Sequence, residues 1–492
     1  MKKEKSLSVN AVLNILRTVL RVAIPMLIFP HITRALGVDL IGKYNFGNSI
    51  TMYFVMIAGL GVYRYGVREG TLFRHDREKF SRFASEVFTI NLCSTALAYV
   101  LLFVSLMTVG KLQDYKTVIL ILSVEILFTT LNIDWIYNVY EDFGFMTVCS
   151  TVFQVLTLVL TFVFVRGPED LELYTVIAKL TIVGTGIFQL IHVRKYCDLR
   201  LILTSESVKK HLKPILLLFV VSITYMLYAN TDITVLGFFT DDHTVGIYST
   251  SAKIYLLFKQ LFEAAFAVMI PRFTLLADGE ENGLRNMFAK TTSYIITILV
   301  PSIVGVIMLS RPIIVIIAGE EYAPAVPSLC LLMLATFFAL FEYLFVQNVL
   351  LPKKKEKIIV SAYVAAAVTN LALNLIFIPL FKEKATIVAA ITTIAAEVVV
   401  SGLACLASRK YAAIRLGVKN IVTITVGCAA IVFCCILSEH FFDNPFLQMG
   451  TGIVTSVCAY FAVLAIARDP LCTEIRGILS SRFSSGSAGT NE

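Results

Sequence analysis

The chain carries little charge and has no long polar stretch. Charged residues make up 15% of its 492 residues, whereas soluble domains carry roughly 25%. The polar segments between its apolar runs are short, and none approaches the roughly 50 residues that a separate domain needs. These two absences argue against an attached ATPase or a water-soluble catalytic domain within this sequence.

The usual signatures of metal and catalytic sites are also lacking. The ten cysteines include no CxxC pair and do not cluster with the six histidines, so we interpret them as small apolar residues and expect no metal site. The segment from Gly37 to Tyr44 nearly matches a phosphate-binding loop, but Tyr44 stands where Ser or Thr must bind magnesium. Neither a nucleophile–base pair nor a glycine-rich dinucleotide loop is present. We therefore expect a protein that is not an enzyme and that needs no cofactor.

Long apolar runs dominate what the sequence does contain. A helix crosses a bilayer with about 20 apolar residues, at about 1.5 Å for each residue. Hydrophobic residues make up 57% of the chain, and fourteen runs between Val9 and Ala467 are long enough. The expected fold class is all-α, a polytopic membrane protein with about 14 transmembrane helices. The expected spans are 9–30, 41–63, 84–108, 116–140, 145–166, 170–193, 212–239, 246–270, 288–310, 325–351, 357–380, 385–407, 419–438 and 446–467.

Lysine and arginine are distributed unevenly between the connecting segments. If the N-terminus lies inside, most of the 42 basic residues also fall inside, in segments such as 64–82, 194–213 and 352–357. This is the positive-inside pattern of multi-pass proteins. It predicts that both termini are cytoplasmic, and it explains the net charge of +8 without nucleic acid as a partner.

A short motif occurs twice. Residues 32–37 are followed by Gly-Lys-Tyr at 42–44, and residues 233–237 are followed by Gly-Ile-Tyr at 246–248. Six helices separate the copies, so both have the same orientation, which indicates a parallel repeat. We expect two parallel six-helix bundles around a central cavity, then two appended helices and a disordered tail: 1–195, 209–408, 419–467 and 480–492.

Basic residues inside the expected spans are the candidate site. A charge facing lipid at a helix centre costs about 2.5–3.5 kcal/mol, so most of these residues should face protein or water. Asn14, Arg17 and Arg21 follow i, i+3, i+7 and therefore share one helical face. With Lys179 and Lys253 they would form a cationic cavity for an anionic substrate, since arginine binds phosphate oxygens in bidentate fashion.

A structural role for the same charges stays open. In that reading the cations, Lys259 among them, pair with buried acids and only hold helices together; the available acids are Glu125, Asp134, Asp232, Glu263, Glu342 and Glu397. Asp134 and Asp232 could instead bind a coupling proton or sodium ion.

Four segments carry a resemblance to a known family. They are Pro30–Gly37 continuing through Ile41–Phe46, Leu60–Glu69 with the basic run to Lys79, Gln347–Pro352 with the lysines after it, and Asn370–Asn374 through Pro379 to Glu397. Their order and spacing resemble the Wzx-type polysaccharide and O-antigen flippases of the multidrug/oligosaccharidyl-lipid/polysaccharide exporter superfamily. Two features depart from the family: the segment 381–385 is not the usual glycine-rich turn, and many members have twelve helices.

The resemblance implies a flippase. Such a protein moves undecaprenyl-pyrophosphate-linked oligosaccharide repeat units from the cytoplasmic to the outer leaflet by alternating access, for export of a surface polysaccharide such as O-antigen or capsule. It implies a bacterial cytoplasmic membrane and, as partners, a polysaccharide polymerase and glycosyltransferases. A lipid II-type flippase, a drug or cation antiporter of the same superfamily, and a polysaccharide polymerase or ligase remain alternatives.

Overall fold

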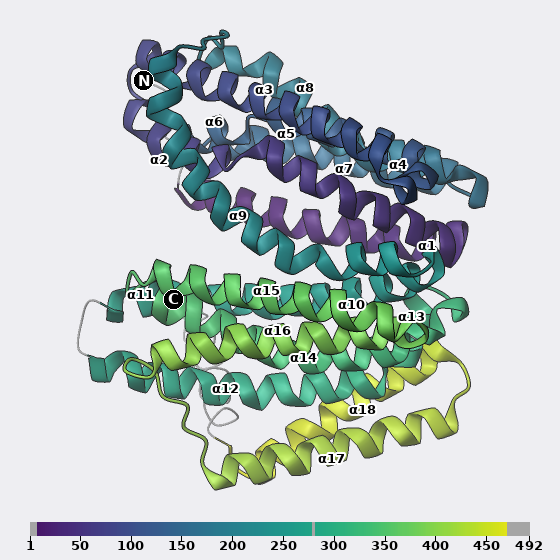
Figure 1. Cartoon of the computed structure of the whole chain (residues 1–492). Coiled ribbons are helices and arrows are strands. Elements are labelled where there is room, and N and C mark those ends of the chain that lie inside the picture. The colour runs from purple at the N-terminus through teal and green to yellow at the C-terminus, as the bar shows by residue number, and fades with distance from the viewer. Residues whose placement is uncertain (1–6, 278–280, 470–492) are drawn as a thin grey trace, which may run out of the picture. The chain divides into compact units, whose positions relative to one another are not determined.

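The computed structural model describes residues 7–277 and 281–469, without the side chains of residues 7–16, 18, 221, 225, 227–229 and 281. Helices are the only regular elements in these ranges (Figure 1). The expected disordered tail, 480–492, lies outside the described residues. The α-helices are α1 Leu7–Gly59, α2 Val62–Gly70, α3 Arg77–Thr108, α4 Lys116–Leu122, α5 Val124–Leu131, α6 Asp134–Val139, α7 Phe143–Phe164, α8 Leu171–His192, α9 Ser205–Phe239, α10 Asp242–Ala267, α11 Ile270–Ala277, α12 Glu281–Met308, α13 Ser310–Ile317, α14 Val326–Phe345, α15 Glu356–Leu380, α16 Ala385–Ser408, α17 Val418–Phe441 and α18 Pro445–Ile466.

The described residues contain 11 helices long and apolar enough to cross a membrane, or 12 if the bent pair α10–α11 is one span. The expected number was fourteen. Part of the difference is α1, which runs through the expected spans 9–30 and 41–63 and is counted once. A second part is α9, which covers the expected span 212–239 but is not among the 11, and the bent pair α10–α11 accounts for the third where it is not counted. The chain is an all-α, multi-pass membrane protein with 11–12 candidate spans.

The regular helix is broken between the expected spans 9–30 and 41–63, and again within the expected span 116–140. Within α1, Gly37 has φ 77° and ψ 176°, which is not helical; side chains disfavour such a positive φ, so glycine suits this break. The expected span 116–140 is three short helices, α4, α5 and α6, with breaks at Ser123 and at Asn132–Ile133. The second break places Asp134 at the first position of α6.

Helix α7 shows how the helices meet lipid. Its valines at 148, 152, 155 and 159 are exposed and follow helical spacing along one face. The opposite face buries polar side chains, including Ser150, Gln154 and Thr157. This inverts the pattern of a soluble helix and is expected where the surrounding solvent is hydrocarbon.

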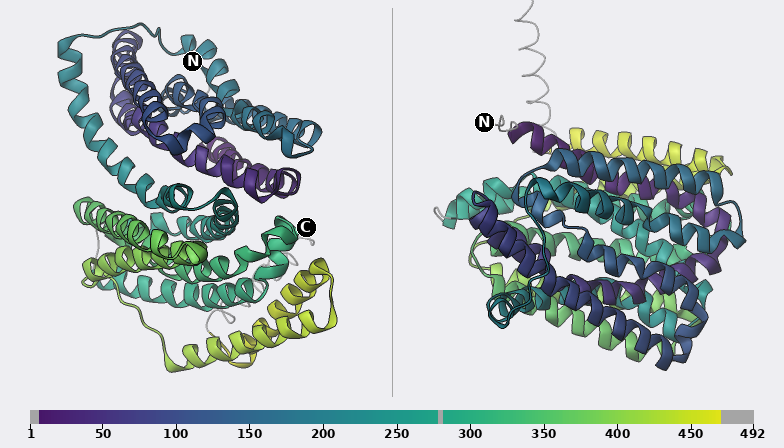
Figure 2. Two further views of the ribbon diagram at one scale, coloured as in Figure 1. Left: turned by 45° about the vertical axis from the view of Figure 1, so that its right-hand side comes forward. Right: turned by 90° about the horizontal axis from the view of Figure 1, so that it is seen from above.

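Contacts divide the chain into two compact units. Unit 1 comprises Met1–Ser249 and Asn370–Val388, and unit 2 comprises Thr250–Thr369 and Ala389–Glu492. In unit 1, α1 packs against α3, α5, α7 and α9. In unit 2, α17 and α18 pack against each other as a hairpin, and α17 also contacts α12 (Figure 2). The expected bundles 1–195 and 209–408 stay a prediction.

The two copies of the repeated motif pack directly against each other in unit 1. A Cβ atom added to Gly42 would lie 1.8 Å from the carbonyl oxygen of Asp242, and one added to Gly246 would lie 2.2 Å from that of Val38. The two contacts are equivalent, because Gly42 in the first copy corresponds to Gly246 in the second and Val38 corresponds to Asp242. The backbones therefore approach as closely as glycine permits.

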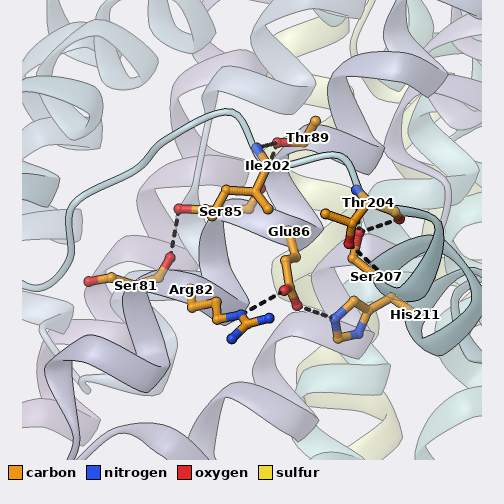
Figure 3. Close-up of polar contacts among 9 residues, drawn as sticks. All are labelled: Ser81, Arg82, Ser85, Glu86, Thr89, Ile202, Thr204, Ser207 and His211. Atoms are coloured by element: carbon orange, nitrogen blue, oxygen red, sulfur yellow. Dashed lines mark hydrogen bonds and ion pairs between the residues drawn. The ribbon is translucent and has the colours of Figure 1, made fainter.

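The segment between α8 and α9 is fastened to α3 by a ladder of hydroxyl groups. The backbone N–H groups of Asp198, Arg200 and Ile202 donate to the side-chain oxygens of Ser81, Ser85 and Thr89, at 3.1, 3.0 and 2.9 Å. The last of these bonds is visible in Figure 3. Two residues of extended chain advance about 6.6 Å, and four residues of helix advance about 6 Å, so the two periods match.

A second set of contacts fixes the beginning of α9. His211 is fully buried, and its two ring nitrogens lie 2.7 Å from the hydroxyl of Tyr65 and 2.9 Å from Oε2 of Glu86. Arg82 donates to the other oxygen of Glu86 at 3.1 Å (Figure 3). Nearby, the backbone N–H of Lys79 donates to Asp76, the N-cap of α3, and this bond holds the pKa of Asp76 below its usual value.

Removing two rungs of the ladder should release the segment. We expect the double variant Ser85→Ala, Thr89→Ala to raise amide hydrogen exchange at 198–202 about thirtyfold, since two hydrogen bonds contribute about 1 kcal/mol each. Exchange is read by mass spectrometry on the purified protein. Ser105→Ala is the control, because that hydroxyl is exposed and bonds within α3, to Leu101. Unchanged exchange in the double variant would contradict the ladder's role.

Candidate functional site

Arg17 of α1 forms an ion pair inside unit 1. Its Nη2 lies 3.0 Å from Oδ2 of Asp134, and its side chain is 12% exposed. Gln189 of α8 donates from Nε2 to the other oxygen of Asp134 at 2.5 Å. Helices α1, α6 and α8 thus meet at one carboxylate, which the break before α6 places within their reach.

Arg17 retains hydrogen-bonding capacity beyond this pair. Its Nη1 lies 3.7 Å from Sδ of Met146, a weak acceptor. Its Nε is buried, with no hydrogen-bond partner among the described residues. A buried donor left without a partner costs about 1–3 kcal/mol. An anion with several oxygens, such as a phosphate, would satisfy such a donor.

A second arginine lies in the same region. Arg21 is one turn further along α1 and is exposed. Tyr63 of α2 lies near enough to Arg17, Arg21 and Asp134 for their charges to act on its hydroxyl group. The structure therefore brings together two of the expected cationic residues and one of the expected acids. The side chain of Asn14, expected on the same face, lies outside the described part of the structure.

Lys179 of α8 occupies a separate polar cluster of unit 1. Its Nζ lies 2.6 Å from Oε2 of Glu125 and donates to Oδ1 of Asn48 at 3.1 Å. Lys179 is buried, and Glu125 is mostly buried. Its charge is balanced by a neighbouring acid, which fits the structural reading of the buried cations better than the binding reading.

Asp232 of α9 is surrounded by neutral donors. The Tyr248 hydroxyl donates to its Oδ2 at 2.5 Å. Asn370 and Asn374 of α15 donate to its Oδ1 at 3.0 and 2.6 Å. Both asparagines are buried, and Asn374 also donates to Oδ1 of Asn370 at 3.1 Å. A carboxylate and two amide groups from two helices thus meet at one point. The amides present N–H to Asp232 here, but they also carry oxygens of the kind that a hard cation prefers.

The remaining expected cation lies in unit 2. Lys253 of α10 is half-buried. Lys259, on the same helix, forms ion pairs with Glu397 at 3.5 Å and Glu263 at 3.9 Å. Among the described residues, no group of three or more His, Cys, Asp and Glu side chains could hold a metal ion.

Four amide side chains that contact these charges were not among the residues predicted from the sequence. Asn48, Gln189, Asn370 and Asn374 each contact one of the charged groups above. The available signal was their position inside apolar runs, where a buried amide needs hydrogen-bond partners. Which charge each amide contacts depends on helix packing, which the sequence spacing does not provide.

Comparison with known proteins gives a family match and distant relatives. Residues 7–276 match the model of a family described as polysaccharide biosynthesis protein. A putative O-antigen transporter of Shigella dysenteriae is 21% identical over 351 residues, covering 70% of this chain and 87% of that protein. One from Escherichia coli K12 is 21% identical over 383 residues, covering 77% and 91%.

The fold is also similar to that of a solved structure. The lipid II flippase MurJ in an inward closed conformation superposes with a TM-score of 0.76, covering 94% of this chain and 99% of that one. The sequences are 15% identical. At that identity the likeness concerns the fold alone.

Proposed function

Because the chain belongs to the polysaccharide biosynthesis protein family, we propose that it is a flippase for undecaprenyl-pyrophosphate-linked oligosaccharide repeat units. It moves them from the cytoplasmic to the outer leaflet of a bacterial cytoplasmic membrane, for export of a surface polysaccharide. It is a transporter and not an enzyme. Both termini lie in the cytoplasm, as the distribution of basic residues favours.

The observation that carries this proposal is that Arg17 is largely buried and not all of its hydrogen-bond donors are satisfied. A guanidinium that is 12% exposed, with a buried Nε lacking a partner among the described residues, is a poor arrangement for stability alone. It is a suitable arrangement for an incoming pyrophosphate, which offers several charged oxygens to a planar fork of donors. Arg21, exposed one turn away, supplies a second positive charge.

The same geometry supports a mechanism. Asp134 holds Arg17 in place before the substrate arrives, and Gln189 orients Asp134. The pyrophosphate then contacts the free edge of the guanidinium, and fixed cations replace the water that solvated its charge. The polyprenyl tail stays in lipid, and alternation between inward-open and outward-open states carries the head group across.

Gene deletion with analysis of the lipid-linked intermediates tests the function. Loss of the flippase should leave complete undecaprenyl-linked repeat units in the cytoplasmic leaflet and remove the surface polymer. Units that reach the outer leaflet but stay unpolymerised would favour a polymerase or ligase. Accumulated lipid II would favour the lipid II-type flippase. Normal intermediates and normal polymer, in a strain without a second flippase, would contradict the proposal and leave a drug or cation antiporter.

Asp232 is the site we propose for the coupling ion. Asp232→Asn keeps the shape of the cluster and removes its charge, so we expect the stimulation of transport by an imposed sodium or proton gradient to disappear. Proteoliposomes with defined gradients and a fluorescent lipid-linked sugar provide the measurement. Asp241→Asn is the control, because that acid is exposed. A variant that still responds fully to the gradients would exclude Asp232 from coupling.

A further inference from the structure

Four helices of unit 2 bring a small set of ionisable side chains together. Lys259 of α10 lies 3.5 Å from Oε1 of Glu397 on α16, and the hydroxyl of Tyr255 donates to the same oxygen at 2.9 Å. On α14, Oε1 of Glu342 accepts from the hydroxyl of Tyr363, on α15, at 2.5 Å.

Both glutamates are almost fully buried. Glu397 is 1% exposed and Glu342 is 5% exposed. The second oxygen of Glu397, Oε2, is buried and has no hydrogen-bond partner among the described residues. A carboxylate with one such oxygen has an acceptor site that a proton or another donor would occupy.

This cluster has fewer positively charged groups than carboxyl groups. None of the described basic side chains lies within ion-pair distance of Glu342, and its cationic neighbour is Lys259, which also faces Glu397. The third acid nearby, Glu263, is 28% exposed on its side chain, so solvent reaches it. Tyr343 is the remaining ionisable group that interacts with these acids. One ammonium group therefore stands against two deeply buried carboxyl groups.

Two ionised carboxylates in this position would leave an uncompensated negative charge in the interior. Isolated buried charges are unfavourable by several kcal/mol, and nearby carboxyl groups avoid ionising together. We propose that Glu342 and Glu397 hold one dissociable proton between them, with Lys259 balancing the remaining charge. The site is a proton-binding site, and it is separate from the proposed ion site at Asp232.

A proton fits this cluster better than a metal ion. The ammonium group of Lys259 already lies beside Glu397 and would repel a second cation. The acids also fail to converge as a metal-ligating group among the described residues. Tyr255 and Tyr363 each donate to one carboxyl oxygen, and such bonds stabilise the ionised form of whichever acid does not hold the proton.

The number of bound protons depends on the position of Lys259. If α10 moved so that Lys259 left the acids, the pair would be expected to take up a second proton; its return would release that proton. A conformational change of unit 2 would then be coupled to proton binding. The use of this proton in transport rests on the proposed function, whereas its presence does not.

Infrared spectroscopy of the purified protein in lipid nanodiscs tests the proposal. The carbonyl stretch of a protonated carboxyl group should be present in the wild-type protein at neutral pH. Glu342→Gln and Glu397→Gln should each remove it, because either change leaves one acid for one lysine. Lys259→Met should raise its intensity about twofold, since both acids then bind protons. Glu263→Gln is the matched control and should leave the band unchanged.

The wild-type protein alone provides a second measurement. Titration to alkaline pH should remove the band and release one proton for each chain, detected with a pH indicator. Absence of the band at neutral pH would overturn the proposal, as would its persistence in both glutamine variants. Loss of the band on addition of sodium at constant pH would also overturn it, in favour of a cation site. The flippase assay is not involved, so this result and that of the proposed function are distinguishable.

Discussion

Replacing Arg17 with methionine is expected to lower transport of the lipid-linked sugar at least tenfold. A hydrogen bond to a charged group contributes about 1.5–3 kcal/mol, so losing even one to the pyrophosphate weakens binding by about tenfold or more. Arg17→Lys keeps the charge but loses the planar fork, and should retain a small fraction of the activity. Flipping of a fluorescent lipid-linked sugar in proteoliposomes is the measurement.

Arg311 provides the matched control. It forms the same kind of pair, with Glu320 at 2.9 Å, but both side chains are more than half exposed. Exposed pairs contribute about 0–1 kcal/mol, so Arg311→Met should leave transport unchanged. The double variant Arg17→Met, Asp134→Asn separates the two interpretations of Arg17. If Arg17 only neutralises Asp134, removing both charges restores transport; if it binds substrate, the double variant stays inactive.

Gly42→Ala should be strongly destabilising although it adds a single methyl group. The new methyl group would lie 1.8 Å from the carbonyl oxygen of Asp242, and this neighbour is backbone that cannot rotate away. Overpacking typically lowers the free energy of unfolding by about 1–3 kcal/mol. Because the neighbour here is backbone, we expect a loss at the upper end of this range or larger. Gly246→Ala should behave alike, because its methyl group would meet the backbone of Val38.

Thermal unfolding in detergent, followed by fluorescence-detected size exclusion, measures the effect. Gly402→Ala is the control, since a methyl group at that helical position meets nothing within 4 Å. It should be neutral or slightly stabilising, because alanine favours helix over glycine by about 1 kcal/mol. Equal unfolding temperatures for Gly42→Ala and Gly402→Ala would show that the two motif copies do not pack as described.

The membrane class and the family were predictable from the sequence. Apolar runs long enough to span a bilayer show that much of the chain lies in lipid. The motifs near Pro30 and Leu60 lie within the segment 7–276 that matches the family, so the resemblance is confirmed. The repeated glycine motif was visible as well. That its copies touch, with Asn45 donating to Ser249 at 2.8 Å, required the structure.

The pairing of the buried charges was beyond the sequence. Helical periodicity places Arg17 and Arg21 on one face, but a partner on another helix depends on packing angles and on irregular breaks. Asp134 meets Arg17 because the expected span 116–140 is interrupted just before it. Periodicity assumes an unbroken helix and therefore misplaces this residue. Lys259 pairs with two of the acids available to it, Glu263 on the same helix at 3.9 Å and Glu397 far along the chain at 3.5 Å, and the sequence did not indicate which pair would be shorter.

The hydroxyl ladder between α3 and the segment before α9 has a consequence for how this chain tolerates changes in length. Every second backbone N–H of the segment points toward α3. A shift by one residue therefore turns the bonding N–H groups away from the helix, whereas a shift by two residues does not. Deleting Leu199 alone would turn the following amides away from Ser85 and Thr89. Deleting Leu199 and Arg200 together would keep the alternation and shorten the ladder by one rung. Relatives of this chain that keep the hydroxyls should therefore differ in this segment by even numbers of residues.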